Sequence, residues 1–141
     1  MGNREAVLEL IRRAYAARGE GDLEGLLSTF HPEGAFTLIG DARTLEITGT
    51  VQGHQSLKEA FAGFIATFKF VDRQILSEIV EADRAVVHSR LTVQYNDKTR
   101  TTECLDLFKF QDGKIIELIE FADTALIKDM TSGATEGPGV T

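Results

Sequence analysis

Two acidic side chains in the last third of the sequence, Asp106 and Glu120, are the best candidates for acid–base chemistry. They lie in the segment 100–123, which predicts two β-strands joined by a turn at Gln111-Asp112-Gly113. Side chains alternate along a strand, so Asp106 falls in a mostly apolar row. Its neighbours in that row are Thr102, Cys104, Phe108 and Phe110. A carboxylate there must be paired, hydrogen-bonded or protonated, because an isolated buried charge is too costly.

The length of the turn decides whether Glu120 lies on the same face as Asp106. In a two-residue loop, Asp112-Gly113, Asp106 lies opposite Ile119 and Glu120 turns to the other face. In a three-residue loop, Asp106 lies opposite Leu118 and Glu120 shares its face. Both loops are common in hairpins, and the residues alone leave the two alternatives open.

Composition narrows the class of protein. The 141 residues suffice for one domain with a core, and 43% hydrophobic and 26% charged residues are an ordinary globular balance. The net charge of −7 and the lack of a basic cluster argue against nucleic acid and anionic membranes as partners. Cys104 is the only cysteine, and the histidines show no metal-ligand spacing, so we expect no metal and no cofactor. A cytoplasmic protein fits this composition.

The N-terminal half predicts three helices. Residues 4–18 carry apolar side chains at helical spacing, and Tyr15 stands on an adjoining stripe from which its hydroxyl could donate to a substrate. Asp22 caps a short second helix, which His31-Pro32 ends. Ser56 and Glu59 form a capping box that opens a third helix with an aromatic-rich face, extending to Phe68.

The remaining segments alternate like strands, over residues 35–39, 44–51, 73–81, 85–95, 99–110 and 114–122, with a short final helix over 124–130. This order predicts an α+β domain in which a curved, mostly antiparallel sheet is wrapped around the long third helix, with the N-terminal helices beside it. We expect a single domain over residues 1–130 and a flexible tail over 131–141.

Such a sheet encloses a cone-shaped pocket. The residues expected to line or fill it are Phe30, Phe36, Leu38, Phe61, Phe64, Phe68, Ser89, Leu91, Thr102, Cys104, Phe108 and Leu118.

The chain resembles the SnoaL-like proteins, which belong to the nuclear-transport-factor-2-like superfamily with the ketosteroid isomerases and polyketide cyclases. The resemblance covers roughly residues 4–130 and implies a cystatin-like α+β barrel. The segments that carry it are Gly21-Asp22-Leu23 with Phe30, Gly53-His54-Gln55-Ser56, residues 106–115 (DLFKFQDGKI) and Phe121-Ala122-Asp123-Thr124.

The resemblance implies roles for individual residues. Asp106 stands where the ketosteroid isomerases have a protonated aspartic acid that donates to an enolate oxygen, a carboxylic acid that its apolar surroundings keep neutral. Their tyrosine falls on Ala14, next to Tyr15, and their general base falls on Leu38, so ketosteroid isomerisation itself is not expected.

The cyclases of this family implicate Glu120. They place an acid–base carboxylate at its position, which implies that Glu120 faces the pocket and favours the three-residue turn. The limonene epoxide hydrolase relatives have an arginine at the position of Cys104, so their chemistry is not expected.

The opposite face of the sheet is also apolar, because Leu105 and Leu107 point away from Asp106, and Val86, Thr92 and Ile119 are expected beside them. A sheet that is apolar on both faces needs a cover on both. A second copy of the chain would cover the outer face, so the sequence predicts a homodimer.

Together these observations predict a cofactor-independent isomerase, cyclase or lyase that acts on a small apolar carbonyl compound. In this interpretation Glu120 moves the proton, Asp106 stabilises the oxyanion, and Tyr15 is a further donor. The alternative is a non-catalytic domain of the same fold that binds a small apolar molecule.

Overall fold

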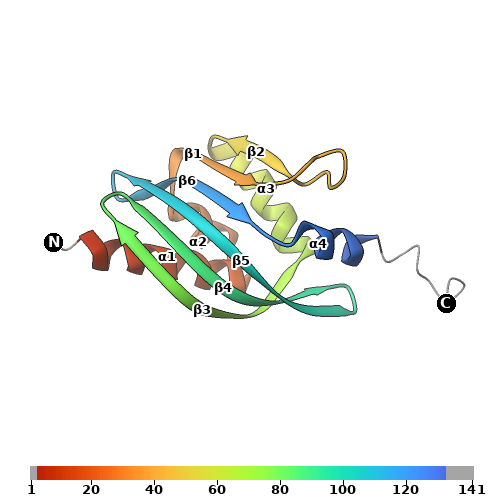
Figure 1. The fold of residues 1–141 in the computed structure, drawn as a ribbon. Coiled ribbons are helices and arrows are strands. Elements are labelled where there is room, and N and C mark those ends of the chain that lie inside the picture. The colour runs from red at the N-terminus through yellow and green to blue at the C-terminus, as the bar shows by residue number, and fades with distance from the viewer. Residues whose placement is uncertain (1–2, 133–141) are drawn as a thin grey trace, which may run out of the picture.

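A computed structural model describes residues 3–132 of the chain. The elements in order are α1 (Asn3–Glu20), α2 (Leu23–Ser28), β1 (Phe30–Leu38), β2 (Gly49–Gln52), α3 (His54–Thr67), β3 (Lys69–Glu81), β4 (Arg84–Tyr95), β5 (Lys98–Gln111), β6 (Lys114–Phe121) and α4 (Thr124–Thr131). The predicted α+β class is confirmed (Figure 1).

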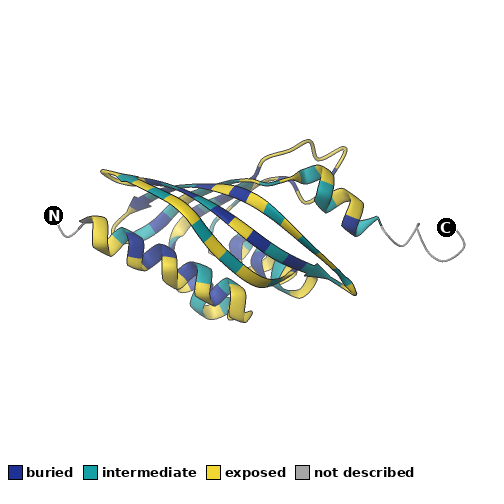
Figure 2. Ribbon diagram, turned by 60° about the horizontal axis from the view of Figure 1, so that its bottom comes forward, coloured by how far each residue is buried: buried dark blue, intermediate teal, exposed yellow. Residues whose placement is uncertain are grey.

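The six strands form one curved sheet in the order β2-β1-β6-β5-β4-β3. All neighbours are antiparallel except β1 and β6, which are parallel. The sheet is open, since β2 and β3 lie at opposite edges. Helices α1, α2 and α3 lie against one face, and buried and exposed residues alternate along the strands (Figure 2). This face therefore holds the apolar core, in which Ile11, Leu57, Val87, Phe108 and Ile115 are almost inaccessible.

Several element boundaries differ from the sequence prediction. Helix α2 ends at Ser28, so His31-Pro32 lies inside β1 and does not end the helix. Strand β3 begins at Lys69, four residues before the predicted start at 73. Strand β1 begins at Phe30, which pairs with Ile115, and not at Ala35. Pro32 is tolerated because the pairing with β6 is irregular between Phe30 and Ala35, so no ladder hydrogen bond is lost there. Strand β2 is shorter than the predicted 44–51, because Thr44 and Leu45 instead turn back to the carbonyl of Asp41.

The predicted capping box of the third helix is wrong. Helix α3 begins at His54, two residues before Ser56, and its N-cap is Gly53 without a side-chain hydrogen bond. Gly53 has a φ of 93°, a conformation that favours glycine, and this fixes the start of the helix.

At the C-terminal end, α4 extends through Thr131, with Ser132 as its C-cap, so the first two residues of the predicted tail complete a helix. The rest of that predicted tail, 133–141, lies outside the described residues. None of the helices described between residues 3 and 132 is both long and apolar enough to cross a lipid bilayer.

Candidate active site

Asp106 and Glu120 face each other directly across β5 and β6. The turn between these strands is a two-residue loop, since Gln111 pairs with Lys114 and the loop residues Asp112 and Gly113 have φ values of 54° and 73°. Positive φ at both positions is typical of a type I′ hairpin turn. The three-residue turn favoured from the sequence is therefore wrong.

Asp106 and Glu120 nevertheless lie on the same face of the sheet, because β6 contains a bulge. Phe110 pairs with Ile115, but Lys109 pairs with Glu117, so Ile116 is an extra residue without an opposite partner. One extra residue shifts the register by one and reverses which side chains face the core. Glu120 is thereby brought onto the face of Asp106 and lies opposite it.

Tyr15 joins this pair from α1. Its hydroxyl donates to Oδ2 of Asp106 over 2.6 Å, and its ring meets Phe108 edge-on at 6.0 Å between centroids. Helix α1 is held against the sheet by the buried residues Ile11 and Ala14, and this anchoring brings the neighbouring tyrosine over β5. The hydroxyl expected to serve a substrate is thus engaged by a carboxyl group of the protein.

Arg73 of β3 completes the network, and the sequence reasoning missed it. Its Nη1 lies 3.8 Å from Oδ2 of Asp106 and donates to Oγ of Ser89 over 2.9 Å. Its guanidinium also lies over the Tyr15 ring, 3.6 Å from the centroid. Ser89, predicted to line the pocket, is instead fully buried beneath Arg73 and is not among the residues that line the cavity described below.

An apolar cavity of about 130 Å³ opens beside this network. The predicted residues that line it are Phe30, Phe36, Leu38, Phe61, Phe64, Phe68, Leu91, Thr102, Cys104, Phe108 and Leu118. Asp106, Glu120 and Tyr15 line it too, with Arg18, which the sequence did not single out. The cavity is therefore a phenylalanine-rich chamber with ionisable groups gathered in one part of its wall.

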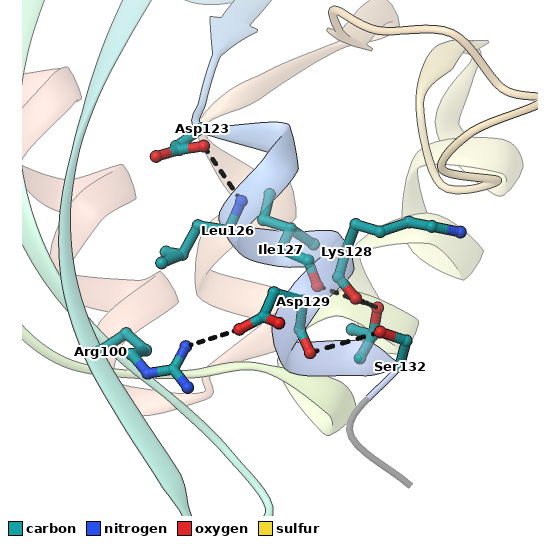
Figure 3. Close-up of polar contacts among 8 residues, drawn as sticks. Arg100, Asp123, Leu126, Ile127, Lys128, Asp129 and Ser132 are labelled. Atoms are coloured by element: carbon teal, nitrogen blue, oxygen red, sulfur yellow. Dashed lines mark hydrogen bonds and ion pairs between the residues drawn. The ribbon is translucent and has the colours of Figure 1, made fainter. Parts of the chain in front are cut away.

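Helix α4 supplies wall residues that were not predicted: Leu126, Ile127 and Met130. The helix is fixed at its start by Asp123, whose Oδ1 accepts from the Leu126 amide over 3.0 Å, and is joined to β5 by Arg100 and Asp129 at 3.2 Å (Figure 3). These two contacts hold the apolar side of α4 against the cavity.

Burial raises the pKa of both carboxyl groups, but by different amounts. For Asp106 the effect of burial on the pKa is opposed by the charge of Arg73 and by the hydrogen bond from Tyr15. For Glu120 burial is reinforced by the charge of Asp106, so its pKa is raised well above its usual value. Tyr15 and Arg73 both contact Asp106 and favour the negative charge there, so we assign the proton of the pair to Glu120.

This protonation state agrees with the hydrogen bonding. Among the described residues, Oδ1 of Asp106 is buried without a hydrogen-bond partner, and a proton shared with Glu120 would satisfy it. The two residues also differ in access, because Asp106 is 1% exposed whereas Glu120 is only partly buried. Burial and the charge of Asp106 raise the pKa of Tyr15, which keeps its hydroxyl a donor. Both carboxyl groups line the cavity, and Glu120 is the more exposed of the two.

Cys104, Asp106 and Glu120 also offer metal-ligand atoms within 4.8 Å of one another. A metal would need the cysteine as thiolate, but burial and the nearby charge of Asp106 raise the pKa of its thiol. Arg73 already supplies a positive charge beside Asp106. These residues therefore fit a shared proton better than a metal ion.

The family of the chain follows from a comparison with protein-family models. Residues 11–118 match the model described as SnoaL-like domain. The chain belongs to the SnoaL-like domain family. Among curated proteins, no sequence matches it significantly.

Solved structures share the fold of this SnoaL-like domain. A candidate isomerase from Bacillus subtilis has a TM-score of 0.84 at 12% identity, over 94% of this chain and 97% of that one. A candidate polyketide cyclase from Xanthomonas campestris has a TM-score of 0.73 at 15% identity, over 91% and 98%. TerC, co-crystallised with polyporic acid, has a TM-score of 0.76 at 24% identity, over 90% and 98%. At these identities the likeness establishes the fold and no particular activity.

Proposed function

We propose that this SnoaL-like domain is a cofactor-independent isomerase or cyclase that moves a proton within a small, mainly apolar carbonyl compound. The direct pairing of Asp106 with Glu120 beside an apolar cavity carries this proposal. A carboxyl group with a raised pKa can both give and take a proton near neutral pH, which is what general acid–base catalysis requires. The isomerase and cyclase descriptions of structures with the same fold point in the same direction.

The two carboxyl groups would divide the work differently from the sequence-based expectation. Glu120 lines the cavity and holds the proton, so it gives that proton to the carbonyl oxygen of the bound compound. The resulting carboxylate then accepts a proton from the carbon next to the carbonyl, and Glu120 returns to its starting state. The product is the enol, whose carbon can attack a second carbonyl of the same molecule in a cyclisation.

Asp106 would act through Glu120, by setting its pKa, and not as a hydrogen-bond donor to the oxyanion. Its negative charge raises the pKa of Glu120, while Tyr15 and Arg73 stabilise that charge. Arg73 is therefore a positioning residue that acts through Asp106. If Asp106 were neutral, Glu120 would be a stronger acid and a weaker base. The pKa of Glu120 would then no longer suit both proton donation and proton removal at neutral pH.

Hydrogen exchange tests the proposal without knowledge of the natural substrate. A panel of single-ring ketones and diketones is incubated with the protein in deuterium oxide, and loss of the α C–H signal is followed by proton NMR. We expect the Glu120→Gln variant to lose exchange by about 100-fold or more, a typical contribution of acid–base catalysis. Glu117→Gln changes an exposed carboxyl group of the same strand and serves as the control. Undiminished exchange in Glu120→Gln would refute the assignment.

A second candidate function, binding of a small molecule without turnover, is favoured by one observation. The Tyr15 hydroxyl is engaged by Asp106 at 2.6 Å, so it is not available to a ligand in this arrangement. Ligands that bind in the cavity without any accelerated exchange, across the whole panel, would support this second function over catalysis.

A further inference from the structure

Arg18 is a second arginine at the cavity, and the proposed proton transfer gives it no role. It lies in the last turn of α1 and lines the cavity. Its Nη2 donates to the carbonyl oxygens of Phe64 and Phe68, over 3.2 Å and 2.8 Å, at the end of α3. Its guanidinium also lies over the Phe70 ring, 3.8 Å from the centroid. Within residues 3–132, the hydrogen bonds of Arg18 both use Nη2, so Nη1 and Nε remain as donors for a ligand.

The charges around Arg18 are not balanced. Arg73 is matched by Asp106, which lies 3.8 Å away. The carboxyl group whose charge acts on Arg18 is Glu120, but Glu120 holds the proton of the pair. Asp123 also lines the cavity, and its carboxylate is engaged in capping α4. Among the described residues, Arg18 is thus a partly buried cation without an ion-pair partner.

The remaining ionisable groups do not remove this charge. Burial lowers the pKa of Arg18 to about 10, so the guanidinium stays protonated at neutral pH. Tyr15 and Cys104 are neutral there, because burial raises the pKa of both. A partly desolvated cation is stabilised most by an anion that replaces its lost hydration.

We propose that Arg18 forms an anion subsite in the cavity, and that the natural ligand is a small, mainly apolar carboxylate. The apolar body of this ligand lies among the phenylalanines, and its carboxylate accepts from one free donor of Arg18, either Nη1 or Nε. The inference rests on the proposed function in one respect, because it uses the same one-proton state of Asp106 and Glu120. It narrows the substrate to a carbonyl compound that also carries a carboxylate.

The size of the cavity suggests the probe. A volume of about 130 Å³ is close to that of engineered apolar cavities, of roughly 150 Å³, that bind benzene. Benzoate therefore offers one ring and one negative charge, and benzamide offers nearly the same shape without the charge. Neither compound has an exchangeable α C–H group, so their binding reports on the subsite and not on turnover.

Binding of both probes is measured by isothermal titration calorimetry at neutral pH. We expect benzoate to bind the unmodified protein about tenfold more tightly than benzamide, or better, as one charge-assisted contact allows. Arg18→Gln keeps a polar side chain but removes the charge, so the preference for benzoate should disappear while benzamide binding is retained. Arg13→Gln, an exposed position on the same helix, should change neither affinity.

Equal affinities for benzoate and benzamide in the unmodified protein would overturn the anion subsite, whether or not Arg18→Gln folds. So would an unchanged preference in Arg18→Gln. Glu120→Gln mimics the protonated state and should keep the preference within about threefold, whereas a much larger preference in that variant would contradict the one-proton state. A preference for benzoate without any α C–H exchange would refute the proposed function but not the anion subsite. Exchange without a preference for benzoate would refute the anion subsite but not the proposed function.

Discussion

Asp106 and Glu120 lie opposite each other on β5 and β6 because Ile116 is an extra residue in β6. Without this bulge the two-residue turn would place Ile119 opposite Asp106 and direct Glu120 to the outer face. A single unpaired residue thus creates the carboxyl pair, and Tyr15 and Arg73 then decide how the pair holds its proton.

The hydrogen bond from Tyr15 to Asp106 predicts the effect of Tyr15→Phe. The variant should lose about 2 kcal/mol in its free energy of unfolding, the usual worth of a hydrogen bond to a buried charged group. Urea denaturation at pH 7 measures this loss. Tyr95→Phe is the matched control, since the Tyr95 ring packs on Phe68 away from the carboxyl pair. A loss no greater than in that control would show that the Tyr15 bond does not stabilise an ionised Asp106.

Removal of the Arg73 charge should shift the proton equilibrium of the pair. The charge of Arg73 lowers the pKa of both Asp106 and Glu120, so in Arg73→Gln both groups should ionise at higher pH. Breaking a buried ion pair on one side also costs about 3 kcal/mol of stability. The pH profile of α C–H exchange separates the two effects, because a purely structural role would lower the rate without moving the profile to higher pH.

The sign of the Glu120 effect on stability is also predictable. Its pKa is raised in the folded state, so the folded protein retains a proton that the unfolded chain loses above about pH 4.3. The contribution of Glu120 to stability is therefore present below that pH and is lost as pH rises through the folded-state pKa. Glu120→Gln cannot ionise and should gain stability over the unmodified protein as pH increases from about 4.5 toward the folded-state pKa of Glu120.

Urea denaturation at several pH values across this range measures the difference, with Glu117→Gln as the control on the same strand. A stability difference between Glu120→Gln and the unmodified protein that does not change with pH would contradict a raised pKa.

The outer face of the sheet predicts a homodimer. Ile79, Val86, Leu107 and Ile119 form a continuous row across β3, β4, β5 and β6, with Leu105 and Phe121 beside it. Ile79 is 63% exposed and Phe121 is 44% exposed, which is unusual for large apolar side chains in a contiguous patch.

We expect a dimer at micromolar concentration in analytical ultracentrifugation, and a monomer for Leu107→Glu. Thr101→Glu, on the same face but outside the row, should remain dimeric, and a monomeric unmodified protein would exclude this interface.

Much of this arrangement could be predicted from the sequence. Period-two alternation identified the apolar row that contains Asp106, and helical spacing identified the aromatic face of α3. Local patterns could not reveal the bulge, because Ile116 is the same residue type as Ile115 and nothing in its type marks it as unpaired. The prediction that Glu120 faces the pocket came instead from the family resemblance. The three-residue turn inferred from that resemblance was wrong.

Arg73 and Arg18 could not be identified from the sequence for a different reason. Arg73 stands two residues before Ile75, so alternation puts both on one face, but a second bulge in β3 sends Ile79 to the outer face and obscures this pattern. Arg18 belongs to the periodic stripe of α1, where a long charged side chain is normally interpreted as one that reaches water. Its position depends on the end of α3, a contact distant in sequence that no local pattern encodes.

The most direct test of the shared proton is a carbon-13 NMR titration of the side-chain carboxyl groups, with Asp106→Asn and Glu120→Gln used to assign the two signals. At pH 7 we expect the Glu120 signal at the position of a protonated carboxylic acid and the Asp106 signal at that of a carboxylate. A Glu120 signal that titrates at about pH 4.3 and is that of a carboxylate at pH 7 would contradict the claim that Glu120 holds the proton.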